Sequence, residues 1–254
     1  MREYIAFVKK EILEQLRTYK MLILISVFFL LGMMSPLIAK IMPDILSGMK
    51  IEGMTIQIPD PTKIDAYSQF FKNFNQMGLL VLLLVFGGIL SNELIRGTLV
   101  NVLAKGLSRA TVILSKFTSA VILWTVGYVI AVLTTYGYTY YLFGNATEPN
   151  LIFSLFCLWM FGCFLISIIL LSGTLTSGTF GGLIVTAVIL VILLMISIVP
   201  NAWKYNPMTL ASKNLDLLKE TVKVSEFYPV LIITAVLTIA SLYIAISLFR
   251  RKKM

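Results

Sequence analysis

The stretch ELIRGTLVNVLAKGLSRATVILSK, residues 93–116, stands between two apolar runs that are each long enough to cross a lipid bilayer. Across the 254 residues, 58% are hydrophobic and the mean hydropathy is +0.91. Charged residues make up 13% of the chain, which is about half the share in an ordinary soluble domain. Lipid must therefore replace water over most of the surface, and the chain is predicted to be an integral membrane protein.

Uninterrupted hydrophobicity predicts an all-α, polytopic fold with six membrane-spanning helices. They are expected at residues 21–42, 76–92, 113–143, 151–172, 180–199 and 229–249. The uncharged run 149–203 is too long for one crossing, so the Ser, Thr and Gly residues of 172–182 are expected to form the turn between the fourth and fifth spans. Because no hydrophilic block is large enough to fold separately, residues 1–254 are predicted to form a single transmembrane domain.

Three segments outside the spans are also expected to be structured. Residues 1–20 are predicted to form an amphipathic helix in the membrane interface. Its apolar side would carry Tyr4, Ile5, Val8, Ile12, Leu13 and Leu16, and its polar side Arg2, Glu3, Lys10, Glu14 and Arg17. Asp60-Pro61 is expected to start a short helix that leads into the second span. Segment 200–228 is expected to cover the outer end of the bundle as a re-entrant or capping pair of helices.

The basic residues predict the orientation in the membrane. Thirteen of the 21 Lys and Arg residues fall in the N-terminal segment, the loop around 96–116 and the C-terminal tail, which the six spans place on one face. The rule that basic loops stay inside makes this face cytoplasmic. We therefore expect a multi-pass protein of the cytoplasmic membrane with both termini in the cytoplasm. Topology and anionic lipid account for the net charge of +9, so no nucleic-acid partner is expected.

The residues that are missing argue against catalysis. Histidine is absent, which removes the commonest general base and the commonest transition-metal ligand, and no metal site is expected. Cys157 and Cys163 lie in one apolar run and are expected to be buried free thiols. With no charge deep in a predicted span, an intramembrane hydrolase and an ion-driven transporter are both disfavoured.

The order of residues in 93–116 resembles the membrane subunits of type-2 ATP-binding-cassette exporters. Their pattern places a Glu at the end of the second helix, then Gly-Thr, apolar residues, a Pro-x-Ser-Arg turn and a Lys at the opening of the third helix. This chain matches the pattern with Glu93, Gly97-Thr98, Leu103, Ser108-Arg109 and Lys116. It departs from the pattern at Gly106, which stands where the family has proline. Since both residues make turns, the departure is expected to be mild.

The resemblance implies a permease that pairs with a second permease, identical or homologous, and with two cytoplasmic ATPase subunits. Segment 93–116 would be a cytoplasmic coupling helix and turn that transmits the motion of the ATPases to the helices. The residues expected to do so are Glu93, Arg96, Gly97, Thr98, Leu103, Arg109 and Lys116. No phosphate-binding G-x-x-x-x-G-K-[ST] motif occurs, so the chain itself is expected to be non-catalytic, with ATP and Mg²⁺ held by the partner.

The composition of the predicted spans suggests the kind of substrate. Their side chains are mainly Leu, Ile, Val, Met and Phe, with Ser and Thr hydroxyls as the polar groups, which suits an amphiphilic peptide antibiotic, toxin or lipid-like drug. A membrane sensor or immunity component that binds an amphiphile without moving it would share this fold and these partners, and stays open as the alternative.

Overall fold

The computed structural model describes residues 2–48, 60–104, 106–176 and 178–252. Residues 49–59, the turn residue Ser177 and the basic residue Lys105 lie outside this part of the chain. The described residues form helices and connecting turns, with no strand among them. In chain order the elements are α1 (Arg2–Arg17), α2 (Lys20–Gly48), α3 (Lys63–Asn73), a π-helix (Phe74–Gly78), α4 (Leu79–Phe86), α5 (Ser91–Ile95), α6 (Thr98–Ala104), α7 (Arg109–Phe143), α8 (Leu151–Leu175), α9 (Thr179–Ser197), η2 (Ala202–Lys204), α10 (Thr209–Ser212), α11 (Asn214–Leu218), η3 (Val224–Phe227) and α12 (Tyr228–Arg251).

The six predicted spans are confirmed in number and order. Helices long and apolar enough to cross a membrane occupy Lys20–Ile45, Lys63–Ile95, Arg109–Phe143, Leu151–Leu175, Thr179–Ser197 and Val224–Arg251. The third span begins before the predicted residue 113 because Ser108 caps α7 one turn earlier, its hydroxyl oxygen accepting from the Thr111 amide at 3.1 Å. The turn between α8 and α9 is shorter than predicted, since α8 continues through Ser172-Gly173-Thr174.

The second span is longer than predicted because the expected amphipathic helix runs into it without a break. α3 passes through one π-helical turn into α4, and Thr62 rather than Asp60 is the N-cap. Both the Thr62 amide and its hydroxyl donate to the Asp65 carboxylate, at 2.9 and 2.8 Å. Gly87 and Gly88 follow α4 in a turn, after which α5 changes direction. The second span is therefore built from several short helical pieces.

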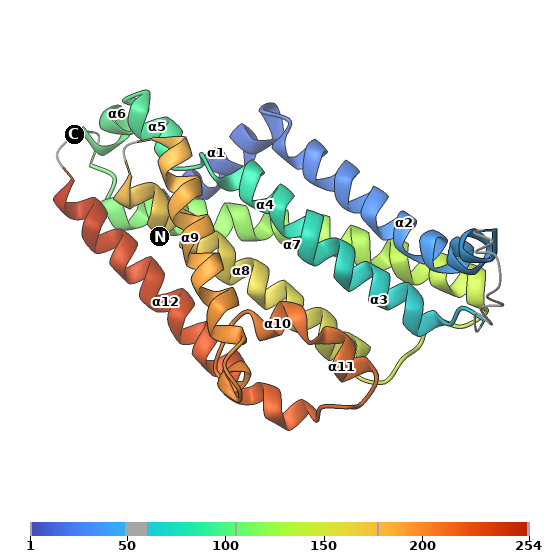
Figure 1. Ribbon diagram of the computed structural model, residues 1–254. Coiled ribbons are helices and arrows are strands. Elements are labelled where there is room, and N and C mark those ends of the chain that lie inside the picture. The colour runs from blue at the N-terminus through green and yellow to red at the C-terminus, as the bar shows by residue number, and fades with distance from the viewer. Residues whose placement is uncertain (1, 49–59, 105, 177, 253–254) are drawn as a thin grey trace.

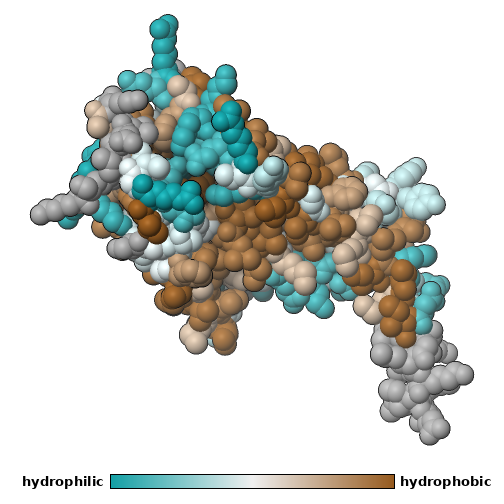
Figure 2. Space-filling view, turned by 90° about the horizontal axis from the view of Figure 1, so that it is seen from above, coloured by the Kyte–Doolittle hydropathy of each residue, from teal (hydrophilic) through white to brown (hydrophobic). Residues whose placement is uncertain are grey.

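Both chain termini lie at the same end of the molecule as α5 and α6 (Figure 1). At the opposite end, Lys63 at the start of α3 pairs with Glu148 at 3.2 Å, and the Tyr67 hydroxyl donates to the Ala146 carbonyl at 2.6 Å. Seen from above, a broad apolar belt separates the hydrophilic end that carries α1, α5 and α6 from the other end (Figure 2). This distribution is what a bilayer-spanning body requires.

α8 lies at the centre of the bundle and α9 at its edge. In the most apolar stretch of each, 67% of the residues are buried in α8 and 11% in α9. α7 packs on α8 through Trp124 and Tyr128, which donate hydrogen bonds to the carbonyls of Trp159 and Leu155 at 3.1 and 2.9 Å. On the other side of α7, Trp124 meets the ring of Phe28 from α2 edge to face, with the centroids 5.6 Å apart. α7 therefore connects α2 to the core of the bundle.

Segment 200–228 forms short helices that pack against the bundle. The side chains of Leu210, Ala211 and Leu217 are fully buried. Asn75 of the π-helix donates to the Ala211 carbonyl at 2.5 Å, and Asn150 donates to the Leu217 carbonyl at 3.4 Å. Each amide thus bonds one carbonyl near the end of α10 or α11, where a helix has no partner of its own for its last carbonyls.

Candidate functional site

Segment 93–116 forms two short helices and the start of α7. Glu93 lies in α5 with its side chain pointing into the protein. α5 ends at Ile95, and Gly97, two residues further on, has a φ of +66° in the left-handed region. α6 then runs in a new direction, and the Thr98 hydroxyl donates to the Glu93 carbonyl at 3.3 Å. The expected change of direction at Gly97-Thr98 is present.

The replacement of proline by Gly106 is a larger departure than the sequence suggested. Gly106 has a φ of +94°, whereas the proline ring holds φ near −65°. The turn before Ser108 therefore follows a backbone path that proline cannot adopt. The departure was expected to be mild because both residues make turns, and that reasoning did not include the sign of φ.

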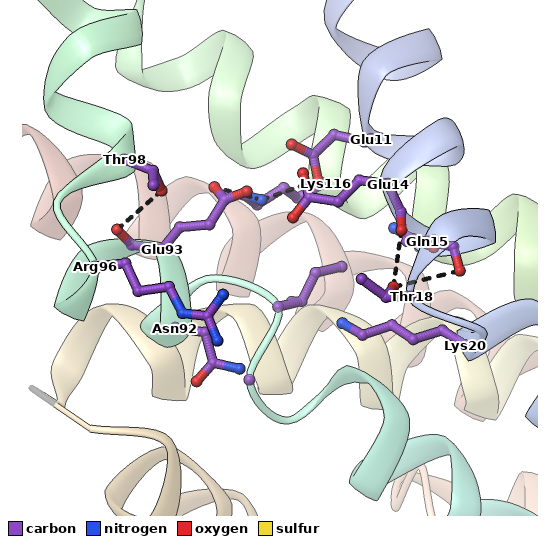
Figure 3. Close-up of a pocket in the computed structure, with 12 residues that line it drawn as sticks. Glu11, Glu14, Gln15, Thr18, Lys20, Asn92, Glu93, Arg96, Thr98 and Lys116 are labelled. Atoms are coloured by element: carbon purple, nitrogen blue, oxygen red, sulfur yellow. Dashed lines mark hydrogen bonds and ion pairs between the residues drawn. The ribbon is translucent and has the colours of Figure 1, made fainter.

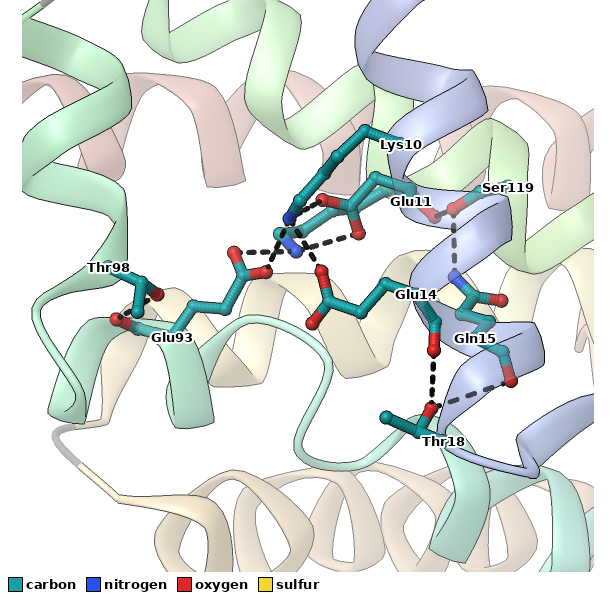
Figure 4. A network of polar contacts seen from close by, with 9 residues as sticks. Lys10, Glu11, Glu14, Gln15, Thr18, Glu93, Thr98 and Ser119 are labelled. Atoms are coloured by element: carbon teal, nitrogen blue, oxygen red, sulfur yellow. Dashed lines mark hydrogen bonds and ion pairs between the residues drawn. The ribbon is translucent and has the colours of Figure 1, made fainter.

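A buried ion-pair network joins α5 to α7 and α1 (Figure 4). The Lys116 ammonium lies 2.8 Å from Glu93 Oε2 and 2.9 Å from Glu11 Oε2. The Lys116 side chain is completely buried, Glu11 is 2% exposed and Glu93 is 8% exposed. Buried charges of this kind are tolerated only when they are paired, so the positions of the three side chains depend on one another.

Lys10 of α1 forms the second positive centre of the network. Its ammonium lies 3.0 Å from Glu11 Oε1, 3.1 Å from Glu93 Oε1 and 2.6 Å from Glu14 Oε2. Burial opposes the charge on Lys10, but the hydrogen bond to Glu14 and the fields of Glu11 and Glu93 outweigh it and raise the pKa of Lys10 above its usual range. Although Glu11, Glu14 and Glu93 lie close enough to hold a metal ion, the two ammonium groups already supply the positive charge between them.

The face of α1 that packs on the protein holds residues that the sequence prediction assigned to neither side of the helix. Its buried face consists of Phe7, Glu11 and Gln15, and the Gln15 amide donates to the Ser119 hydroxyl of α7 at 3.0 Å. Two residues of the predicted apolar side, Ile5 and Leu16, are 60% and 44% exposed. The polar residues Glu11 and Gln15 thus face the protein, and part of the predicted apolar side faces outward, where lipid would cover it.

The remaining predicted site residues lie outside the ion-pair network and differ in their surroundings. The Arg96 side chain is exposed, although it lies at i+3 from Glu93, and Glu93 pairs with Lys10 and Lys116 instead. Leu103 is half-buried against the core, and Thr98 is exposed.

Arg109 lies away from the network, at the end of α12. Its Nη1 atom lies 2.6 Å from the Phe249 carbonyl, 2.7 Å from the Arg250 carbonyl and 2.9 Å from the Lys252 carbonyl. Lys252 in turn donates to the carbonyls of Thr174 and Thr176 at the end of α8, at 3.1 and 2.8 Å. The last carbonyls of two helices are thus satisfied by cations, which also interact favourably with the helix dipoles. Arg109 therefore connects the start of α7 to the ends of α8 and α12.

Replacing Arg109 by Met should loosen this end of the bundle. Hydrogen bonds to a charged group contribute about 1.5–3 kcal/mol, and the loss should appear as faster amide hydrogen exchange over residues 249–252. Arg109→Lys should recover only part of the protection, because the lysine ammonium ends one bond nearer the backbone than the Nη1 atom that makes all three contacts. Unchanged exchange in Arg109→Met would contradict the capping role.

The Lys10–Glu14 pair predicts a dependence of stability on pH. Burial works against the charged carboxylate, but the hydrogen bond and charge of Lys10 lower the pKa of Glu14. The pair therefore contributes its full stabilisation of the folded chain above the unfolded-state pKa of about 4.3. This stabilisation is lost as the pH falls through the lower pKa of Glu14 in the folded state. Because the Glu14 side chain is 44% exposed, the contribution should stay below about 1 kcal/mol. Thermal unfolding at pH 3 to 6 should show a smaller acid destabilisation in Glu14→Gln than in the unchanged chain.

The sequence pattern did not identify Lys10, Glu11 and Glu14 as part of the site. A signal was present, since Phe7, Glu11 and Gln15 recur every four residues and therefore share one face of a helix. That face was assigned no partner because its spacing does not show which other helix packs against it.

The helical body, the α5–α6 hairpin and the buried network define a polytopic membrane protein with a structured hairpin between its second and third spans. The model of the ABC-2 family transporter proteins matches residues 5–252, nearly the whole chain. The chain therefore belongs to the ABC-2 family and is a membrane permease component of an ATP-binding-cassette transporter, which works with ATPase subunits. No curated protein matches this sequence.

Proposed function

We propose that this chain is the permease subunit of an ATP-driven exporter in the cytoplasmic membrane. It would assemble with two cytoplasmic ATPase subunits, which hold ATP and Mg²⁺, and with a second permease. The observation that carries the proposal is the buried contact between the α5–α6 hairpin and α7, made by Glu93 and Lys116 at 2.8 Å. Residues 93–116 would be the coupling segment that transmits the motion of the ATPases.

The network explains how motion of a small surface hairpin would reach the membrane-spanning helices. A hairpin displaced by a partner would pull on Glu93, and separating Glu93 from Lys116 would leave buried charges unpaired at a cost of about 3–5 kcal/mol. Moving α7 together with the hairpin avoids this cost. Because Glu11 and Lys10 pair with the same groups, α1 would move with them. Arg109 would transfer the motion at the start of α7 to the end of α12.

The charge distribution supports the proposed orientation. Lys10, Arg96, Arg109 and Lys252 lie in α1, the hairpin, the start of α7 and the C-terminal end, all of which gather at one end of the molecule (Figure 1). The rule that basic segments stay inside would place this end, with both termini, in the cytoplasm. The hairpin would then face the compartment that contains ATP.

An amphiphilic substrate is supported by the chemistry of the helix surfaces. Large apolar side chains are exposed along α2, α9 and α12, among them Phe29, Val188 and Ile239. Such surfaces accept apolar molecules of varied shape rather than one defined polar substrate. A peptide antibiotic, toxin or lipid-like drug fits this chemistry.

Transport by the assembled complex in sealed vesicles tests the proposal. With the ATPase subunits facing outward, ATP should drive a fluorescent amphiphilic peptide into the vesicle lumen, whereas a non-hydrolysable ATP analogue should not. Peptide-stimulated ATP hydrolysis without accumulation would contradict export and favour the sensor or immunity component.

A further inference from the structure

A polar cavity of about 190 Å³ lies beside the ion-pair network (Figure 3). Its walls come from the end of α1, the start of α2 and the segment from Gly88 to Thr98. Lys20 reaches into the cavity from the α2 side and Arg96 from the opposite side, after α5 (Figure 3). Asn92 lies between them on the α5 wall.

The unpaired charge in this cavity is positive. The carboxylates of Glu11, Glu14 and Glu93 also line it, but each is held by Lys10, and two of them also by Lys116. Lys20 and Arg96, in contrast, form no ion pair within residues 2–48, 60–104, 106–176 and 178–252. The lining residues carry three positive charges (Lys20, Arg96 and Lys116) and three carboxylates (Glu11, Glu14 and Glu93), so their charges balance (3 − 3 = 0). Lys10 lies outside the lining and pairs with the same three carboxylates, which leaves Lys20 and Arg96 as the cations of the cavity that no carboxylate holds.

The cavity lies where the polar end of the molecule meets the apolar belt. Lys20 is the first residue of the first span, and Arg96 follows the last residue of the second. The apolar neighbours Leu22 and Ile95 are 61% and 59% exposed, so lipid chains can cover the surface next to the cavity. In a bilayer, this boundary between apolar and polar surface coincides with the layer of lipid phosphates.

We propose that the cavity binds a phosphate group between Lys20 and Arg96, and that its source is the headgroup of an anionic phospholipid. The guanidinium would hold two phosphate oxygens, and the ammonium a third, as charge-assisted hydrogen bonds. The Asn92 side chain lines the same wall. This lipid would hold the α1–α2 corner against the α5 end of the second span. The site stands on this geometry alone and does not depend on the direction of transport.

Lipid binding by the purified full-length chain tests the site. The chain would be titrated with phosphatidylglycerol or phosphatidylcholine in detergent, and bound lipid counted by native mass spectrometry. The double variant Lys20→Gln/Arg96→Gln should bind phosphatidylglycerol about tenfold more weakly and phosphatidylcholine unchanged, since about 1.4 kcal/mol is tenfold in affinity. The matched control Lys9→Gln/Arg17→Gln removes two exposed cations of α1 and should bind like the unchanged chain.

Inorganic phosphate at millimolar concentration distinguishes the sources of the anion. If inorganic phosphate does not displace the bound phosphatidylglycerol, the result would support the lipid headgroup as the ligand. If inorganic phosphate displaces the lipid, the result would support free phosphate as the ligand of the same site. Equal loss of lipid in both double variants, or equal binding of the two lipids by the unchanged chain, would overturn the site. Unfolding temperatures in lipid-free detergent check that the variants fold, and Lys20→Arg should retain binding.

Discussion

Replacing Lys116 by Met should destabilise the chain more than any other single substitution in the network. The substitution keeps the side-chain volume but leaves Glu11 and Glu93 facing each other with only Lys10 to neutralise them. Breaking a buried pair by removing one partner costs about 3–5 kcal/mol. Denaturant unfolding in detergent, followed by circular dichroism, should show the loss.

Two further variants distinguish the effect of the lost ion pairs on stability from the effect of altered packing. Glu93→Gln/Lys116→Met removes one charge of each sign and should be more stable than Lys116→Met alone, because Lys10 then faces fewer unmatched carboxylates. Lys63→Met breaks the ion pair with Glu148 at the opposite end of the molecule. Because the Lys63 side chain is 31% exposed, this variant should lose less unfolding free energy than Lys116→Met. A double variant as unstable as Lys116→Met would mean that packing, not charge pairing, determines the stability.

Replacing Glu93 by Gln or Ala should uncouple ATP hydrolysis from transport. The hairpin would lose its ion pairs to Lys116 and Lys10, while Lys116 would keep Glu11 and the helices would still insert. Coupling between distant sites is usually worth about 1–3 kcal/mol, so the amount of substrate moved per ATP should fall about five- to 150-fold. The measurement compares ATP hydrolysis and transport in the same vesicles, together with the amount of chain inserted.

Glu148→Gln is the matched control for this experiment. Its side chain is 6% exposed and pairs with Lys63, but it lies at the end of the molecule opposite the hairpin. Removing the Glu148 charge tests whether the loss of any buried carboxylate uncouples ATP hydrolysis from transport. The ratio of transport to ATP hydrolysis should stay unchanged in this variant. If Glu93→Ala transports normally, or if Glu148→Gln uncouples equally, the hairpin is not the route of coupling.

The spans could be predicted from the sequence because hydrophobicity over about 20 residues is a local property. Their ends depended on details that hydrophobicity does not record, such as the Ser108 cap and the continuous passage from α3 to α4. The ends were therefore misplaced by up to a few turns, whereas the number of spans was right.

The candidate site could be predicted only in part, for a different physical reason. Glu93 and Lys116 lie close in sequence, within one recognisable pattern. Glu11 is 105 residues from Lys116, and nothing local shows that the buried face of α1 is its polar one. Arg109 lies within the pattern, but its partners are carbonyls 140 or more residues away. The tertiary arrangement alone reveals these partners.

Photo-cross-linking from position 104 in native membranes tests the central claim most directly. Ala104 is exposed at the end of α6, and a photoreactive residue there should form a covalent adduct with the ATPase subunit of the complex. Tyr141, which is 84% exposed near the other end of α7, is the control position and should give no such adduct. An ATPase adduct from position 141 but not from position 104 would contradict the account, because the hairpin would then face away from the nucleotide-binding partner.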